Sequence, residues 1–177
     1  MIAAALDFIC LELRTYLGVA EADVTAGAAR MLAGPDRPPG VYLSVVNIHE
    51  DAALRSQPRV ERGGVSQRVG PPLHLNIDLL FAFEFPTYAA SLAHLSKTIE
   101  RFQLKPLFSS DTQAAPDATP LPVSIEKLVF EMVNVDFEDL HHLWGALGTA
   151  YLPSVLYRVR LVKAQASAEA SAPGGAR

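Results

Sequence analysis

Cysteine is nearly absent from this chain of 177 residues. Its single cysteine, Cys10, excludes an intramolecular disulfide, and the apolar neighbours Phe8, Ile9 and Leu11 favour a packing role over a reactive one. No apolar run reaches the ~18 residues that a membrane span needs. The N-terminal stretch also lacks the basic segment and cleavage site of a signal peptide. We therefore expect a cytoplasmic protein with no membrane partner.

Basic charge is also scarce. The chain has 15 lysines and arginines against 19 aspartates and glutamates, which gives a formal net charge of −4. A protein that binds nucleic acid or an anionic membrane through general electrostatics needs a basic face, so neither partner is expected. Half of the residues are hydrophobic, which is enough material for a sizeable core in one domain.

The motifs of common catalytic and cofactor sites are missing as well. The Gly-Gly pair at 63–64 is not followed by the Lys-Ser/Thr of a phosphate loop, and neither G-x-G-x-x-G nor G-x-S-x-G occurs in a fitting context. His141 and His142 are adjacent, and although Glu138 can share a helix face with either, no third metal ligand follows at a suitable spacing. We expect no catalytic residue, no cofactor and no metal.

Residues 73–85 carry the strongest structural signal that is present. Apolar side chains occupy every second position of this stretch, which predicts a long strand with one buried face. Leu80 and Ala82 interrupt the polar side, which indicates that the second face is partly covered too.

Two other kinds of periodicity predict the remaining elements. Apolar residues at spacings of three and four predict helices, with Thr87 and Asp136 as caps of the second and third. Alternation and β-branched residues predict strands. The expected helices are 2–17, 88–102 with the apolar stripe Tyr88, Leu92, Leu95, Ile99 and Phe102, and 137–147 with the stripe Phe137, Leu140, Trp144 and Leu147; the expected further strands are 41–49, 123–134 and 153–162.

This order of elements predicts one α+β domain over residues 1–163. We expect a sheet of about four strands, mixed or antiparallel, packed with about three helices. Residues 164–177 are small and polar and lack aromatic side chains, so we expect a disordered tail.

The polar segment 50–72 shows no pattern of apolar residues that would pack against a core. It holds four arginines, which are consistent either with a solvated loop or with a docking loop that contacts acidic groups of a neighbouring subunit. The candidates for such an inter-subunit contact are Arg55, Arg59, Arg62 and Arg68.

Two long segments carry a family resemblance. They are PLHLNIDLLFAFEFPTYAASLAHLSKTIERFQLKPLFS and LPVSIEKLVFEMVNVDFEDLHHLWGALGTAYLPSVLYRVRLV, together with the opening helix and the phrase VNIHED. Over about residues 1–163 the chain resembles the N-terminal domain of the tail-terminator, or cap, proteins of phage-tail-like contractile injection systems.

The resemblance implies a bacterial structural protein. In that role it forms a homo-hexameric ring that closes and terminates the tube and sheath, with tube and sheath proteins as partners and no catalysis. The alternatives are a baseplate or cargo adaptor of the same kind of particle and a small cytoplasmic enzyme with an unfamiliar site.

Overall fold

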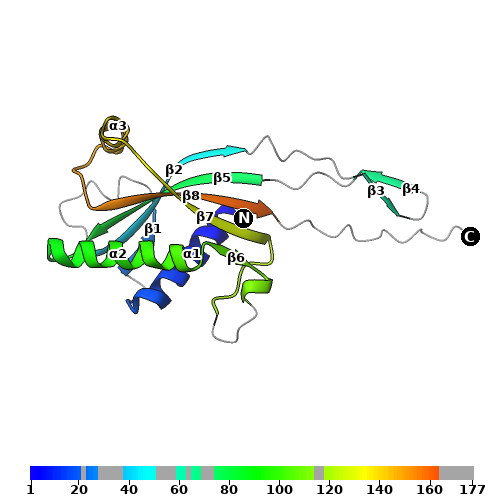
Figure 1. Ribbon diagram of the computed structural model, residues 1–177, viewed down its shortest axis with the longest axis horizontal. Helices are drawn as coiled ribbons and strands as arrows, with labels where there is room; N and C mark the ends of the chain where they lie inside the picture. The colour runs from blue at the N-terminus through cyan, green and yellow to red at the C-terminus, as the bar shows by residue number, and fades with distance from the viewer. Residues whose placement is uncertain are drawn as a thin grey trace, which may run out of the picture.

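The computed structural model describes residues 1–20, 23–27, 38–50, 59–62, 65–68, 74–113 and 118–163, and for 59–62 and 65–68 it describes the backbone alone. The expected tail at 164–177 lies outside these residues. Figure 1 shows the arrangement of the elements. The helices are α1 (Ile2–Leu17), α2 (Tyr88–Leu104) and α3 (Phe137–Leu147), with a short 3-10 helix η4 (Asp111–Gln113).

One mixed sheet forms the centre of the fold. Its six strands follow the order β1-β2-β5-β8-β7-β6; β1 is parallel to β2, and the other pairings are antiparallel. The expected α+β fold with a mixed sheet is confirmed, with more strands than expected. The strands are β1 (Val24–Ala26), β2 (Gly40–Glu50), β5 (His74–Glu84), β6 (Leu107–Ser109), β7 (Ile125–Val133) and β8 (Ser154–Lys163), and β3 (Arg59–Arg62) and β4 (Val65–Arg68) form a separate hairpin.

The helix ends follow from local chemistry. Thr87 accepts a hydrogen bond from the Ala90 backbone N–H and Asp136 accepts one from Asp139, so both expected N-caps are confirmed. Helices α1 and α3 end at Gly18 and Gly148, whose φ angles of 67° and 66° favour glycine.

Glycine is also required where β1 meets β2. A Cβ atom at Gly40 would lie 2.7 Å from the backbone oxygen of Asp23, which is closer than real Cβ contacts come. The missing side chain thus lets the chain before β1 approach the start of β2. Strand β1 was not predicted because three residues are too few to show a period.

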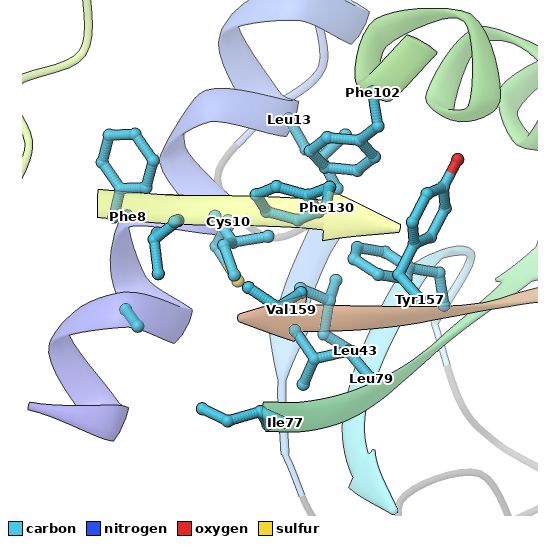
Figure 2. Close-up of a cluster of buried hydrophobic side chains, with 14 of the residues drawn as sticks. Phe8, Cys10, Leu13, Leu43, Ile77, Leu79, Phe102, Phe130, Tyr157 and Val159 are labelled. Atoms are coloured by element: carbon cyan, nitrogen blue, oxygen red, sulfur yellow. The ribbon is translucent and has the colours of Figure 1, made fainter. Parts of the chain in front are cut away.

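The main core lies between the sheet and helices α1 and α2, which cover the same face (Figures 1 and 2). Its centre is aromatic: the Phe102 ring stacks on Phe130 with 4.1 Å between centroids, and Tyr157 meets Phe81 edge to face at 5.7 Å. Cys10 is buried in this core, as its apolar neighbours predicted.

Helix α3 covers part of the opposite face. Trp144 is buried against Tyr42, Leu80 and Ala82, so the prediction of a partly covered second face is confirmed. Phe137 was expected to join the apolar stripe of α3, but it is 91% exposed. That expectation was wrong, because the apolar side of α3 that packs against this cluster begins at Leu140 and does not include Phe137.

The expected stripe of α2 was only partly right. Phe102 is buried, but Tyr88 and Leu92 are exposed. The buried positions instead include Ser91 and Thr98, whose hydroxyl groups are satisfied: Ser91 accepts from the Phe85 backbone N–H at 3.0 Å, and Thr98 donates to the His94 carbonyl at 2.9 Å.

Candidate assembly surfaces

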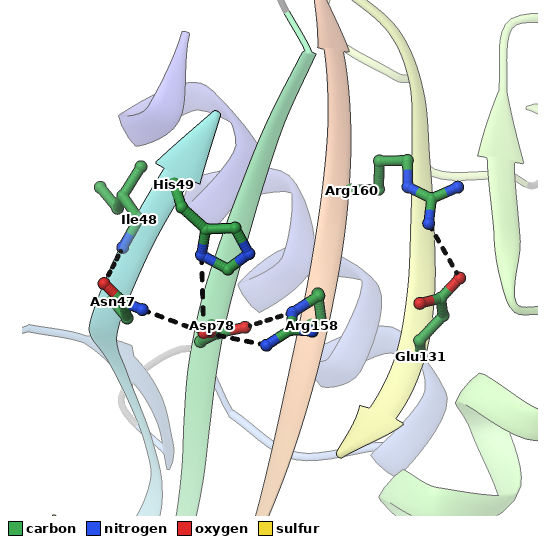
Figure 3. Close-up of polar contacts among 7 residues, drawn as sticks. All are labelled: Asn47, Ile48, His49, Asp78, Glu131, Arg158 and Arg160. Atoms are coloured by element: carbon green, nitrogen blue, oxygen red, sulfur yellow. Dashed lines mark hydrogen bonds and ion pairs between the residues drawn. The ribbon is translucent and has the colours of Figure 1, made fainter. Parts of the chain in front are cut away.

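A buried carboxylate organises the part of the second sheet face that α3 leaves uncovered. Asp78 in β5 is 6% exposed. Arg158 in β8 donates from Nε to Asp78 Oδ1 at 2.9 Å, and Asn47 in β2 donates from Nδ2 to Oδ2 at 3.4 Å (Figure 3). The His49 ring lies 3.9 Å from the same oxygen. The hydrogen bond to Asp78 raises the pKa of Arg158, so its guanidinium stays protonated.

A second ion pair extends this arrangement to β7. Arg160 in β8 donates to Glu131 at 3.3 Å (Figure 3), and Arg158 is the register partner of both Asp78 and Glu131. Acidic and basic side chains therefore alternate from β5 across β8 to β7. We call His49, Asp78, Arg158, Arg160 and Glu131 the polar band.

Sequence reasoning did not single out the polar band. A signal was present, since β5 has an aspartate and β8 has two arginines on their polar sides. However, the alternation within each strand shows only that these side chains lie on the same face of their own strand. The pairing of β5 with β8, 80 residues apart, brings Arg158 to Asp78.

An apolar groove borders α3. It has a volume of about 240 Å³ and lies between the helix and the end of β7, with Leu140, Leu143 and Tyr151 among its lining residues. The ring of Tyr151 also meets Trp144 edge to face at 5.5 Å, and the buried Trp144 Nε1 has no hydrogen-bond partner among the described residues.

A third surface feature lies where α1 meets α2. Arg101 donates to the buried Glu12 carboxylate, and its guanidinium also lies 5.1 Å from the centroid of the Tyr16 ring. These residues line a pocket of about 280 Å³ together with Thr15, Lys105 and Thr119. Because the buried Glu12 carboxylate on α1 is paired with the partly exposed Arg101 guanidinium on α2, the arrangement joins the helices.

The arginine-bearing segment is not one continuous loop. Strand β2 extends to Glu50, and strands β3 and β4 pair as a hairpin, so the expectation of a segment without regular structure was wrong for those residues. The register places Arg59 opposite Arg68 and Arg62 opposite Val65. Arg55 lies outside the described residues. In Figure 1 the hairpin lies beyond the ends of β2 and β5.

The residues weighed for chemistry form no shared site among the described residues. Burial raises the pKa of the Cys10 thiol to about 11, which keeps it protonated at neutral pH. His142 and Glu138 lie 3.8 Å apart on the exposed side of α3. The described part of the chain has no group of three or more His, Cys, Asp or Glu side chains placed to hold a metal ion.

No helix among the described residues is long and apolar enough to cross a membrane.

Comparison with known families assigns the chain. The sequence model of the Pvc16 N-terminal domain matches residues 6–176, nearly the whole chain. The chain belongs to the Pvc16 N-terminal domain family. This confirms the resemblance seen in the two long sequence segments. Among curated proteins, no significant match to the chain is found.

Two solved structures share the fold of this Pvc16 N-terminal domain. One is the sheath/tube terminator, in the extended state, of the extracellular contractile injection system PVC: it has a TM-score of 0.54 and 18% identity, and the match covers 100% of this chain. The other is the tube-terminating cap of the anti-feeding prophage, with a TM-score of 0.62, 16% identity and 91% coverage of this chain. The expected tail-terminator-like fold is confirmed. The chain spans 61% and 54% of the lengths of these two proteins.

Proposed function

We propose that this chain is a structural subunit of a ring that caps and terminates the tube and sheath of a phage-tail-like contractile injection particle. The observation that carries the proposal is membership of the Pvc16 N-terminal domain family over residues 6–176. The fold likeness to two terminators supports it. The ring has six copies and assembles in the bacterial cytoplasm with tube and sheath proteins, and its role is structural rather than catalytic.

The two faces of the sheet suit this role. A terminator binds the last layer of a polymer and offers no equivalent surface to a further layer, so its ring needs two unlike sides. Contacts between two different surfaces of one subunit close into such a ring. Here helices α1 and α2 cover one face, whereas α3 and the polar band divide the other.

We also propose that the segment 50–72, which includes the β3–β4 hairpin, contacts a neighbouring copy through Arg55, Arg59, Arg62 and Arg68. A two-stranded hairpin is marginally stable by itself in water, and the register places Arg59 opposite Arg68. Acidic groups on a neighbouring subunit would stabilise such a hairpin through charge-assisted hydrogen bonds to arginine.

The proposed function is tested in the particle. The gene is deleted in a producing strain and restored from a plasmid, and tube lengths are measured by electron microscopy. We expect tubes of uncontrolled length or unstable sheaths after deletion and a narrow length distribution after restoration. Tubes of normal length that lack another component would instead identify an adaptor and overturn the terminator proposal.

A second measurement addresses the ring. The purified full chain has a mass of 19.1 kDa, so native mass spectrometry separates a hexamer from a monomer directly. We expect a species six times the chain mass. A protein that stays monomeric at high concentration would contradict the ring.

A further inference from the structure

The central sheet has two incompletely covered edges. At one edge, β1 pairs only with Val41–Leu43, and no described strand pairs with the outer side of β2 from Val45 to His49. At the other edge, β6 pairs only with Lys127–Val129 of β7, which leaves Glu131–Val133 without an outer neighbour among the described residues. Unpaired strand edges are ready-made sites for strand addition.

These two open segments lie at the same level of the sheet. Residues that face each other across neighbouring strands form rows, and one row runs Val45, Leu79, Tyr157, Met132. The next row runs Asn47, Asp78, Arg158, Glu131. The open part of β2 and the open part of β7 are therefore the two ends of the same rows.

The strand directions are complementary as well. Three antiparallel pairings separate β2 from β7, so these strands run in opposite directions. A second copy rotated about an axis parallel to the strands would lay its β7 beside β2 of the first copy in antiparallel orientation. The rows of the two copies would then lie at the same height along that axis. A shift along the axis at every contact would build an open helical filament of subunits. Copies whose rows lie at the same height can instead close into a ring.

Apolar side chains at both edges project from the same face. Val45 and Ile48 belong to rows that face the main core, as does Met132, yet all three are exposed. A register shift between Val45 and Asn47 makes this possible, because the extra residue in β2 puts Val45 and Ile48 on one face. Pairing of the edges would bring Met132 of one copy beside Val45 and Ile48 of the next.

The polar band is complementary at its two ends. At the β2 edge the row ends in Asn47, which donates one amide N–H to Asp78 of its own subunit, and at the β7 edge it ends in the Glu131 carboxylate, which is 51% exposed (Figure 3). Joined edge to edge at the same level, two copies would place Glu131 of one beside Asn47 of the next, where the carboxylate can accept the second amide N–H, and the polar row would continue across the junction.

We infer that the partner of the open β2 edge is the open β7 edge of a second copy of this chain, so that the sheets of successive subunits join edge to edge around the ring. The inference rests on the proposed ring function and adds the surfaces that form it. The occupant is a second copy because the two edges match in level, direction, apolar face and polar ends.

The test blocks each edge separately in the full chain. Ile48→Lys and Met132→Lys place a charged side chain at the β2 and β7 edges, where the wild-type side chains are 44% and 48% exposed. Leu92→Lys on α2 is the matched control, because that leucine is 39% exposed and lies on neither edge. Unfolding midpoints equal to that of the wild type establish that each variant folds. If Ile48→Lys fails to fold, Val45→Lys is used to block the β2 edge instead.

Native mass spectrometry at a series of protein concentrations then measures how strongly each variant associates. We expect association at least about tenfold weaker for each edge variant, and no change for Leu92→Lys. Mixing the two edge variants should give a 1:1 dimer and no ring, since each supplies the edge that the other has lost. A dimer retained by Met132→Lys alone would indicate β2–β2 pairing and overturn the inference.

The remaining outcomes separate this inference from the proposed function. Rings formed by both edge variants at wild-type concentrations would overturn the edge pairing and leave the cap function standing. A wild-type chain that never associates would contradict the ring itself.

Discussion

Two buried carboxylates of this domain are held in place by arginines from distant parts of the chain. Glu12 on α1 pairs with Arg101 on α2, and Asp78 on β5 pairs with Arg158 on β8. Removal of one partner from a buried pair leaves an uncompensated charge, which costs more than the intact pair contributes. These arginines therefore act as positioning residues for the elements that carry them.

Arg101→Ala tests this role in the main body. We expect the free energy of unfolding to fall by about 3 kcal/mol, because the Glu12 carboxylate would remain buried without its partner. The measurement is urea unfolding at neutral pH. Lys97→Ala, an exposed charge on the same helix, is the matched control and should lie within about 0.5 kcal/mol of wild type.

A double variant separates the buried charge from the lost contacts. Glu12→Leu combined with Arg101→Met replaces both members of the pair by apolar side chains, so no charge is left buried without a partner, and most of the lost stability should return. Equal stability of Arg101→Ala and wild type would contradict the assignment.

Cys10 provides a second prediction because it is the only cysteine of the chain. Burial raises its pKa from 9.0 to about 11, so the thiolate population at pH 8 is about a hundredfold lower than for an unshifted thiol. We expect labelling by a thiol reagent to follow unfolding of the domain. Since the folded state binds this proton more tightly, stability should fall as pH rises from 9 towards 11.

The control is Cys10→Ala, which should remove the part of that pH dependence due to the thiol. Fast stoichiometric labelling of the native protein would show that Cys10 is accessible and contradict its place in the core.

At the scale of the elements, α3 differs from the other two helices. Its contacts are with a small cluster around Trp144, whereas α1 and α2 border the main core. The helix is also the shortest of the three. Stability within a domain follows such differences in burial, so α3 is expected to open separately from the sheet.

Asp136→Ala should increase this opening. The substitution removes the hydrogen bond to the Asp139 backbone N–H, which is worth about 1 kcal/mol at a helix N-terminus. Amide hydrogen exchange should become about fivefold faster in α3 and stay unchanged in β5. Asp111→Ala, at the start of the 3-10 helix, is the control for a lost carboxylate elsewhere. Uniform acceleration through the whole domain would show instead that α3 unfolds only with the sheet.

The long elements were predictable because their signals are local. Seven alternating apolar positions marked β5, and Thr87 and Asp136 marked the starts of α2 and α3. The short strands β1 and β6 were missed, since three residues show no period and their pairing partners define them. The buried face of α2 was misplaced because Ser91 and Thr98 satisfy their hydroxyl groups internally and so can be buried like apolar residues.

The candidate assembly surfaces were beyond local reasoning for a related cause. That Val45 and Met132 end the same row depends on three strand pairings between residues far apart in the chain. The register shift in β2 places Ile48 on the same face as Val45, although simple alternation would put the two on opposite faces. The sequence of β2 alone does not indicate this shift. Sequence patterns indicated which side chains share a face of one strand, and the sheet order determined which faces meet.

At the scale of the whole molecule, two separate devices are proposed for self-assembly. The open edges of the sheet would set the orientation of neighbouring copies and their height along the ring axis. The β3–β4 hairpin would contact a neighbouring copy through its arginines. Apolar edge pairing is weakly sensitive to salt, but contacts between exposed charges are screened at ionic strengths of about 0.1 M and above. The two contributions can therefore be separated by experiment.

Simultaneous replacement of Arg55, Arg59, Arg62 and Arg68 by serine is the test of the hairpin. We expect the oligomer to dissociate at concentrations about tenfold higher than wild type, with an unchanged unfolding midpoint, because the hairpin is separate from the six-stranded sheet. Replacement of the same four residues by lysine is the matched control: it keeps the charge but loses the planar, bidentate geometry, so an intermediate effect is expected. Analytical ultracentrifugation at low and high salt measures both, and the serine variant should respond least to salt. If the serine variant assembles like wild type, the arginine contacts are wrong, and association then depends on the strand edges, whose own variants would still weaken it.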